Sequence, residues 1–498
     1  MTMMHERIAC PSLREKVVSA ETAASLIQDG MTVAFGGYTS AGYPKAIPLA
    51  LAKRRASGES LALNVVTSST CGPVDTLLGN AGIIRRRTPM TDSRPLSRQI
   101  NAGQVQYCEQ QMNKLPRLLK TGAFGRIQVA VVEALGITAD GGIIPTTAIG
   151  MEPSLLDAAE AVIVEINLSQ PEILAAFHDI YRPQPGTPIP LCHVSQRIGS
   201  SSISMDPSKV QAIVFTEGLD ETSEPAPSTP AQRALAGHLF HFLEQEMWRT
   251  GQTRLPPIQT GFGNLASEVV HCLADSSFSD IEFYCGGLQA ANLELLATGR
   301  AKAASCGSIQ LTPTALTLLE NEQATLRRAL VIRNGEVTNH AETISRMAPI
   351  TLTSGIEIDI YGNVNSSHVS GARVINGLGG GANFAENAGL SVMMLVSESK
   401  GGSISTIVPM VSHQDICEHD IDVVVTEHGV ADLRGKTETE RALAIIQNCT
   451  GSYRPQLLDY FERACATGGH HPVLLHEAFS WHLALQENGT MRLLHGAR

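Results

Sequence analysis

Short apolar runs alternate with stretches of helical spacing along most of the chain. In the N-terminal half, strand-like runs occupy residues 31–37, 61–67, 127–137, 161–168 and 210–217. Two of these runs are almost continuously apolar, as expected of strands that are buried on both faces of a parallel sheet. The alternation predicts an α/β fold with mostly parallel sheets covered by helices.

The first helices carry recognisable boundary signals. Residues 19–30 read as a helix with Ser19 as its N-cap and Gly30 as its C-terminal stop. Residues 44–58 read as a second helix, with Pro44 in the first turn. The glycine loop before this helix, FGGYTSAGYP, follows a strand, so we expect it at the carboxyl edge of the sheet, where α/β proteins bind ligands. An ordinary strand-to-helix turn is the alternative.

A polar, proline-rich segment at 220–230 divides the chain. It is followed by a strongly amphipathic helix at 231–251. A strand, a glycine loop and a helix at 258–274 then repeat in kind the pattern at the start of the chain. We therefore predict two related α/β domains, residues 1–222 and 231–498.

A glycine-rich region between two strand-like runs is the clearest candidate for chemistry. The runs are GIEIDIYG and SVMMLVSES, and a third run, DIDVVVTEHG, contains Glu427. The glycines between them are Gly377, Gly379, Gly380 and Gly381. Glycine lets backbone amides approach a ligand closely, and clustered amides suit a phosphate or a developing oxyanion. A purely structural turn is the alternative.

The composition narrows the possibilities mainly by exclusion. The chain has 498 residues, 43% of them hydrophobic, and a formal net charge of −11. Such an acidic chain is not expected to bind nucleic acid. The ten cysteines lack zinc or CxxC spacing, which indicates reduced thiols in a cytoplasmic protein. No apolar run approaches the ~20 residues that cross a membrane, and the N-terminus lacks the apolar core of a secretory signal.

Two groups of basic residues have competing interpretations. Five arginines could grip phosphates or carboxylates, or could simply lie on a solvated surface. They are Arg85, Arg86, Arg87, Arg94 and Arg98. His238 and His241 could begin a metal site, but no acidic or cysteine partner completes a set, so we expect core or surface histidines and no bound metal.

Several motifs resemble the acetyl-CoA hydrolase/transferase family. The C-terminal ones are GNVNSSHVSG, NGLGGGANFAENA, ISTIVPMVSHQDICEHD and VVVTEHGVADLRG. FGGYTSAGYPKAIPLALAKRR, QTGFGNLASEVV and LQAANLELLATG match further landmarks, so the likeness covers most of the chain. Within that family, the motifs resemble those of succinyl-CoA:acetate and propionyl-CoA:succinate CoA-transferases. The resemblance implies two α/β CoA-transferase-type domains and an acyl-CoA substrate, with coenzyme A as the group carried. We expect a homodimer that acts on this small molecule and an unknown acceptor.

One departure from the family pattern concerns the catalytic residue. In the family, a strand that reads roughly Tyr-Ser-Glu-Val-Leu-Gln carries the catalytic glutamate. Here the corresponding residues are Tyr284-Cys285-Gly286-Gly287-Leu288-Gln289. Gly286 therefore stands where the resemblance places the nucleophile. Without a side chain there, an acyl-glutamyl anhydride cannot form unless another carboxylate replaces the glutamate.

The resemblance also implies the rest of the site. Gly380 matches the glycine whose amide donates to the oxyanion, Phe262 an opposing main-chain position, and Asn339 an active-site asparagine. The loop residues expected to contact the CoA-bearing substrate are Gly261, Gly263, Asn264, Gly377, Gly379 and Gly381. Ala382 and Asn383 depart from the Ser-Gly-Asp-Phe pattern of relatives. Together with the glutamate loss, they suggest altered chemistry.

Three side chains could substitute for the missing nucleophile. Glu282 precedes Gly286 by four residues on the same strand face, but at about 13 Å it is too far away to replace the missing group without rearrangement. Cys285 could accept an acyl group as a thioester, although a small buried residue is the alternative interpretation. Glu427 could orient water or act as a general base, or could be a structural carboxylate that satisfies backbone amides.

Two classes of function follow from these features. The first is an acyl-CoA-utilising enzyme that transfers an acyl group, or CoA, to a second substrate or water without the usual glutamyl-CoA intermediate. A conventional acyl-CoA:carboxylate CoA-transferase that uses another carboxylate is a variant of it. The second is a non-catalytic acyl-CoA-binding relative or partner subunit. Turnover of short acyl-CoAs would distinguish the two classes.

Overall fold

The computed structural model describes residues 6–492, and the chain forms two compact units. Unit 1 comprises Met1–Glu224 and Glu282–Met347, and unit 2 comprises Pro225–Ile281 and Ala348–Arg498. The first change of unit, after Glu224, lies within the polar segment predicted as the boundary. The chain then returns to unit 1, so the units are interleaved and differ in this respect from two consecutive domains.

Unit 1 is built on a seven-stranded sheet in which all neighbouring strands are parallel. The strand order is β10-β8-β5-β1-β2-β3-β4. The strands are β1 Thr32–Phe35, β2 Leu63–Thr67, β3 Ile84–Thr88, β4 Gln106–Tyr107, β5 Ile127–Ala134, β8 Ala159–Asn167 and β10 Val210–Thr216. The two longest apolar runs form the interior strands β5 and β8, which confirms the predicted parallel, helix-covered α/β architecture.

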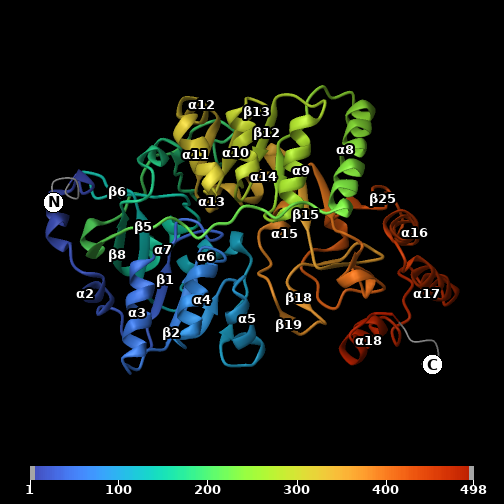
Figure 1. The fold of residues 1–498 in the computed structure, drawn as a ribbon, viewed down its shortest axis with the longest axis horizontal. Helices are drawn as coiled ribbons and strands as arrows, with labels where there is room; N and C mark the ends of the chain where they lie inside the picture. Colours follow the sequence, from blue (N-terminus) through green and yellow to red (C-terminus); the bar gives the residue numbers. More distant parts are fainter. Residues whose placement is uncertain (1–5, 493–498) are drawn as a thin grey trace. The chain divides into compact units, whose positions relative to one another are not determined.

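Helices pack side by side along this sheet (Figure 1). They are α2 Ala20–Ala24, α3 Ala46–Ala56, α4 Gly72–Asn80, α5 Arg94–Asn101, α6 Leu115–Lys120 and α7 Glu152–Ala158. Ser19 caps α2 as predicted, because its hydroxyl accepts the amide hydrogen of Thr22. The apolar faces of these helices and the sheet form the core of unit 1, which includes Val33, Ile47 and Val131.

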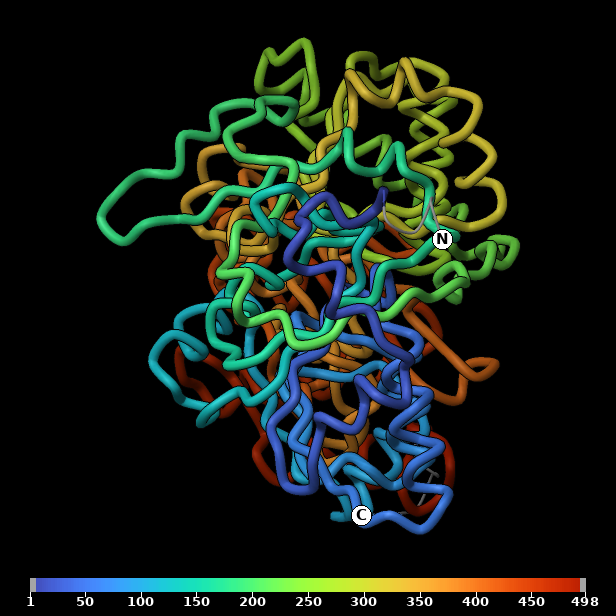
Figure 2. Tube along the Cα trace, turned by 90° about the vertical axis from the view of Figure 1, so that its left-hand side faces the viewer, coloured from blue at the N-terminus to red at the C-terminus, as the bar shows by residue number. Residues whose placement is uncertain are grey.

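A second group of strands in unit 1 runs in the order β12-β13-β14-β9. These strands are β12 Ile281–Tyr284, β13 Ala301–Cys306, β14 Leu330–Arg333 and β9 His178–Asp179. The associated helices are α10 Ala290–Ala297, α11 Pro313–Asn321, α12 Gln323–Ala329, α13 Gly335–Thr338 and α14 Ala341–Met347. The remaining short elements are β6 Gly136–Ile137, β7 Ile143–Ile144 and the 3₁₀ turns η1 Pro11–Lys16, η2 Met112–Lys114, η3 Glu172–Ala176 and η4 Pro207–Lys209. Figure 2 shows the stretch between β9 and η4 in green, as a loop that extends outward.

Unit 2 contains five adjacent strands in the order β25-β24-β20-β15-β11. They are β11 Ile258–Thr260, β15 Ile350–Ser354, β20 Leu390–Met394, β24 Val423–Thr426 and β25 Gly429–Asp432. β11, β15, β20 and β24 are parallel, and only β25 is antiparallel to its neighbour. The carboxyl ends of the four parallel strands therefore meet at one edge, which positions the loops that follow them.

The helices of unit 2 have clear boundary residues. They are α8 Pro230–Thr250, α9 Asn264–Asp275, α15 Gly381–Asn387, α16 Glu438–Cys449, α17 Arg454–Ala466 and α18 Ser480–Asn488. Thr229 and Gln232 form a capping box at the start of α8, and Gly251 ends it in a left-handed conformation. The predicted helix at 231–251 is thus confirmed to within one residue.

Short strands and turns complete unit 2. They are β16 Glu357–Asp359, β17 Val364–Asn365, β18 His368–Val369, β19 Arg373–Val374, β21 Glu398–Ser399, β22 Ile404–Ser405, β23 Ile407–Val408, η5 Lys400–Gly402 and η6 Glu418–Asp420. The core of this unit gathers Ile358, Val424, Ile445 and Trp481 from strands and C-terminal helices.

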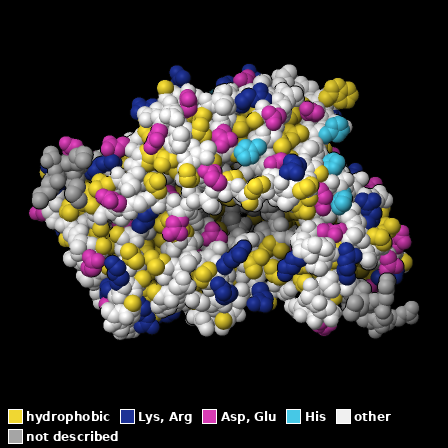
Figure 3. All heavy atoms as spheres, in the orientation of Figure 1, with side chains coloured by type: hydrophobic (Ala, Val, Ile, Leu, Met, Phe, Trp, Pro, Cys, Tyr) yellow, Lys and Arg dark blue, Asp and Glu magenta, His cyan; other side chains and the backbone are white. Residues whose placement is uncertain are grey.

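The surface carries both signs of charge. On the face drawn in Figure 3, Lys and Arg side chains are interspersed with Asp and Glu side chains. The formal net charge of −11 is therefore the difference between many charges of both signs. Across residues 6–492, none of the helices combines the length and the apolar character that a membrane crossing demands.

Candidate functional site

Gly286 lies in unit 1, immediately after the carboxyl end of β12, and is partly accessible to solvent. A side chain at this position would start close to two other residues of the same unit. The three atoms nearest to an added Cβ are Tyr38 Oη at 3.3 Å and the Asn339 Nδ2 and Oδ1 atoms, both at 3.9 Å. The space beside Gly286 is therefore lined by a phenol hydroxyl and a carboxamide.

Tyr38 and Asn339 are joined by a hydrogen bond although 301 residues separate them. The Tyr38 hydroxyl donates to Asn339 Oδ1 at 3.0 Å, and both side chains are buried. Burial raises the pKa of Tyr38 well above its usual value, so the phenol stays protonated and remains a donor. The Thr338 hydroxyl donates to the same Oδ1 atom at 2.9 Å.

These two donors fix the orientation of the Asn339 carboxamide, because only its oxygen can accept hydrogen bonds. The Nδ2 group consequently points away from both hydroxyls. It is buried and has no hydrogen-bond partner among the described residues. An unused buried amide donor costs free energy unless a ligand oxygen or water satisfies it, so Asn339 Nδ2 is a candidate contact for substrate.

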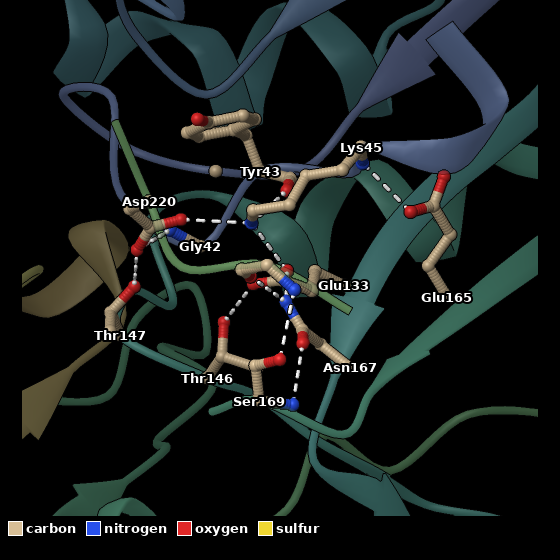
Figure 4. Close-up of polar contacts among 12 residues, drawn as sticks. Gly42, Tyr43, Lys45, Glu133, Thr146, Thr147, Glu165, Asn167, Ser169 and Asp220 are labelled. Carbon is tan, nitrogen blue, oxygen red and sulfur yellow. Dashed lines mark hydrogen bonds and ion pairs between the residues drawn. The ribbon is translucent and has the colours of Figure 1, made fainter. Parts of the chain in front are cut away.

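The loop that carries Tyr38 is held by a buried polar network (Figure 4). Lys45 Nζ contacts Glu133 Oε1 at 2.5 Å and Asp220 Oδ1 at 3.0 Å. Asp220 Oδ2 also accepts the Gly42 amide at 3.1 Å and the Thr147 hydroxyl at 2.5 Å. Paired charges of this kind are costly to disrupt one at a time, and the network therefore fixes the loop between β1 and α3.

Burial sets the ionisation of this network. It raises the pKa of Glu133 to about 7, against the opposing attraction of the Lys45 ammonium. The pKa of Lys45 is raised because the attraction of Glu133 and Asp220 exceeds the effect of its burial.

A second buried carboxylate, Glu152, supports the same loop from α7. Its Oε1 atom accepts the Gly37 amide at 3.1 Å, next to Tyr38. Burial raises the pKa of Glu152 well above its usual value, which favours the neutral acid. No sequence motif points to Tyr38 or to Glu152. A single tyrosine in a glycine loop and a single acid at the start of a helix are common features without a recognisable pattern.

A pocket of about 870 Å³ opens beside Asn339 in unit 1. Its walls come from α6 and the turn after it, from α7, from residues 182–185 and from the segment 334–340. Asn339 is part of this lining and also lies beside Gly286. The pocket is large enough for a small-molecule ligand.

Two other candidates, Glu282 and Cys285, lie just before Gly286 in the chain. The Cys285 side chain is fully buried. A thiol that no substrate can reach is a poor nucleophile, so its burial favours the interpretation as a small core residue. Glu282 is half-buried and lies within β12, before the strand ends.

The predicted residues of unit 2 gather at one edge of its parallel strands. Phe262 and its glycine neighbours follow the carboxyl end of β11. Gly380 is the N-cap of α15, and Gly381 packs near Thr353 at the end of β15, where its added Cβ would lie 3.7 Å from that side chain. Glu427 follows the end of β24. Because β11, β15, β20 and β24 are parallel, these loops share the carboxyl edge of the sheet.

Two glycines in these loops adopt conformations that favour glycine. Gly263, the N-cap of α9, has φ of 110°, and Gly379 has φ of 65°. The remaining predicted loop residues lie beside them at intermediate or full exposure; they are Gly261, Asn264, Gly377 and Gly381. This exposure is compatible with ligand contact.

Glu427 is held in place by the neighbouring strand end. Its carboxylate accepts the Ser397 amide at 2.9 Å and the Ser397 hydroxyl at 2.6 Å, and its Oε1 lies 3.4 Å from His428 Nε2. The side chain is 14% exposed, so it is anchored and still reachable by solvent. Such an arrangement fits either a positioned base or a structural carboxylate.

The arginine run and the histidines of α8 were the remaining candidates for ligand contact. Arg87 is fully buried and pairs with Asp75, with Nε to Oδ1 at 2.6 Å, whereas Arg85 and Arg86 are exposed. His241 is exposed on α8, where its ring lies 3.0 Å from the Gln245 side chain. The arginine run therefore divides into one core residue and a solvated surface.

Comparisons with known proteins agree with this architecture. The family models for the N-terminal and C-terminal domains of acetyl-CoA hydrolase/transferase match residues 4–215 and 320–461. The chain is 38% identical to a succinyl-CoA:acetate CoA-transferase of Clostridium kluyveri, over 98% of this chain and 92% of that protein. It is 34% identical to an acetyl-CoA hydrolase of Kluyveromyces lactis, over 99% and 98% of the two chains. The structure of a 4-hydroxybutyrate CoA-transferase from Porphyromonas gingivalis is similar with a TM-score of 0.62 at 18% identity, over 90% of this chain and 98% of that chain.

The fold and the loops at the carboxyl edges of its parallel strands place the molecule among α/β proteins of the CoA-transferase type. The chain belongs to the acetyl-CoA hydrolase/transferase family. Its relatives are enzymes that act on acyl-CoA thioesters, which supports an enzymatic role for this chain.

Proposed function

We propose that this protein transfers the acyl group of a short acyl-CoA to a second substrate or to water without forming a glutamyl-CoA intermediate. In this proposal Gly286 takes the place of the catalytic glutamate. The observation that carries it is the environment of Gly286, where the nearest side-chain atoms are the Tyr38 hydroxyl and the Asn339 carboxamide. Neither group can form the anhydride on which conventional CoA exchange depends.

The transfer would be direct. An oxygen nucleophile attacks the thioester carbonyl carbon, a carbon–oxygen bond forms and the carbon–sulfur bond breaks. CoA leaves as the thiolate and takes up the proton that the nucleophile loses. We assign the stabilisation of the tetrahedral oxyanion to the backbone amides at Phe262 and Gly380.

Two side chains would assist this step. The fixed and unpartnered Asn339 Nδ2 would donate to a substrate oxygen. Glu427 would accept the proton of the nucleophile and pass it to the leaving thiolate, since Ser397 anchors its carboxylate while the side chain remains partly exposed.

The test is turnover with acetyl-, propionyl- and succinyl-CoA, measured as free thiol with and without carboxylate acceptors. The proposal expects turnover above background and no CoA adduct on any glutamate peptide by mass spectrometry. Absence of turnover with all three donors, despite measurable acyl-CoA binding, would favour a non-catalytic binding protein.

A second outcome of this experiment would support conventional CoA exchange through another carboxylate. Glu152 and Glu336 are buried acids near the loop of Tyr38 and in the pocket lining, respectively. A glutamyl-CoA adduct that maps to either peptide would identify a substitute nucleophile and would overturn the direct transfer proposed above.

A further inference from the structure

The pocket beside Asn339 has a charged rim and a buried floor. Arg117, Lys120 and Arg182 lie in its lining with the carboxylates of Asp157 and Glu336. Arg117 and Lys120 are exposed, whereas Glu336 and Asn339 are buried. All the lining residues belong to unit 1.

The positive charges at the rim are not equally engaged. Arg182 pairs with Asp157 and also donates to the Ser204 carbonyl at 2.7 Å. Arg117 and Lys120 are three residues apart on α6 and therefore lie on the same side of the helix. Within the described chain, neither has an ion pair or a side-chain hydrogen bond. Two cations at the rim are thus available to an anionic ligand.

The acid on the floor is already engaged by donors of the protein. Glu336 accepts the Ser154 amide at 3.2 Å and the Ser154 hydroxyl at 2.7 Å, and it also accepts from Asn334 at 2.8 Å. Burial raises the pKa of Glu336 above its ordinary value, which favours its neutral form. Because Asp157 is paired with Arg182, the side chains of Arg117 and Lys120 leave the rim of the pocket positively charged, which favours an anion.

The floor also presents a polar atom that the protein leaves unused. Asn339 is 1% exposed, and its Nδ2 has no partner among the described residues. Nδ2 is a donor only, so it selects an oxygen with a free lone pair and rejects an ammonium group. The two features together define a ligand with an anionic group for the rim and an oxygen for the floor.

We propose that this pocket binds the acceptor substrate, a small carboxylate that carries an oxygen nucleophile. Its carboxylate contacts Arg117 and Lys120, and its nucleophilic oxygen lies at Asn339 beside Gly286. The role as acceptor rests on the proposed acyl transfer, whereas binding of such a carboxylate does not. The empty position at Gly286 then gives the oxygen room that a glutamate side chain would otherwise take.

Titration calorimetry with matched ligands tests the pocket directly. The probes are 3-hydroxybutyrate, 1,3-butanediol, which lacks the carboxylate, and butyrate, which lacks the hydroxyl. We expect 3-hydroxybutyrate to bind about tenfold more tightly than either analogue, since each analogue leaves one end of the pocket unpaired. Inorganic phosphate is the fourth probe, and tighter binding of phosphate than of every carboxylate would overturn the assignment.

Paired variants localise the binding. Arg117→Gln with Lys120→Gln should weaken 3-hydroxybutyrate about tenfold and remove its advantage over the diol. Arg86→Gln with Arg94→Gln removes the same charge from exposed residues outside the pocket and should leave binding unchanged. Equal affinity in both double variants, or a diol that binds as well as the acid, refutes the site. Carboxylate binding without any turnover of acyl-CoA would reject the transfer reaction and leave the pocket assignment standing.

Discussion

Gly286 and Tyr38 lie so close that the side chain at one position limits the side chain at the other. An added Cβ at 286 would be 3.3 Å from Tyr38 Oη, closer than ordinary van der Waals contact. Tyr38 cannot move freely, because its hydroxyl is hydrogen-bonded to Asn339 and its ring is buried. A glutamate at 286 therefore conflicts with a tyrosine hydroxyl at 38, and a phenylalanine there would relieve the conflict.

The pair of Gly286 and Tyr38 can be tested by placing a glutamate at position 286. Gly286→Glu alone should give little CoA exchange between succinyl-CoA and acetate, because the new side chain meets the Tyr38 hydroxyl. Gly286→Glu combined with Tyr38→Phe should exchange at least about tenfold faster and should accumulate a glutamyl-CoA adduct visible by mass spectrometry. Gly286→Ala with Tyr38→Phe supplies the Cβ without a carboxylate and serves as the control. Equal exchange in the single and double glutamate variants would show that the hydroxyl does not restrict the position.

Glu427 allows a second test at the same scale. Glu427→Gln keeps an oxygen that can accept from the Ser397 amide and hydroxyl, so the variant should fold with an unchanged melting temperature. The variant removes the base that we propose, and acyl transfer should fall by about 10²- to 10⁴-fold. Steady-state kinetics with free-thiol detection measure the effect. A variant that is as active as the parent would reduce Glu427 to a structural carboxylate.

Family motifs in the sequence propose Glu427 and Asn339 as site residues, and this role stays a prediction. No motif points to Tyr38, because its partner Asn339 lies 301 residues away and only folding brings the two side chains together. Arg87 shared a surface-like run with Arg85 and Arg86, although it is fully buried against Asp75. A charge run does not reveal which member has a buried partner elsewhere in the chain.

At the scale of elements, the alternation of strands and helices was predictable because hydrophobic periodicity and capping residues are local signals. Strands β5 and β8 and helix α8 lie where the pattern placed them. The first helix ends at Ala24, well before the predicted stop at Gly30. Glycine marks a permitted end of a helix, whereas packing decides where the last turn forms.

The start of helix α3 gives a prediction at this scale, because its cap comes from another element. Glu165 on β8 accepts the backbone amides of Lys45, Ala46 and Ile47 at 2.7, 2.8 and 2.6 Å. Glu165→Gln replaces one acceptor by a donor and leaves buried amides unpaired. The free energy of unfolding should fall by about 1–3 kcal/mol. Denaturant titration provides the measurement.

A matched control separates the cap from general effects on β8. Glu160 lies on the same strand but is exposed and pairs with Arg126 at the surface. Glu160→Gln should change the free energy of unfolding by less than about 1 kcal/mol. If the two variants were equally stable, Glu165 would not be the cap that fixes the loop between β1 and α3.

At the scale of the whole molecule, the interleaving of the units lay beyond the sequence pattern. The second half repeats a strand, glycine loop and helix, which supported a single boundary near 220–230. In the structure the segment Glu282–Met347 belongs to unit 1. Local patterns identify elements, but the choice of the unit in which an element packs depends on long-range contacts that periodicity does not encode. Gly286 lies within this segment, so the sequence pattern could not show which residues surround it.

The pH dependence of stability tests a buried group of the folded chain. His178 on β9 is buried, its ring nitrogen lies 2.9 Å from the Thr146 carbonyl, and burial lowers its pKa to about 4. The unfolded chain binds the imidazole proton near pH 6.5, so between pH 6.5 and 4 the unfolded state holds more protons than the native state. Stability from the neutral ring is therefore complete above pH 6.5 and is lost as the pH falls, by on the order of 3 kcal/mol. Denaturant titrations from pH 7 to 4 should show a shallower loss in His178→Gln than in the parent, whereas His193→Gln, at an exposed position, should retain the parent slope. Parallel slopes for the parent and His178→Gln would mean that the native ring takes up its proton as readily as the unfolded one.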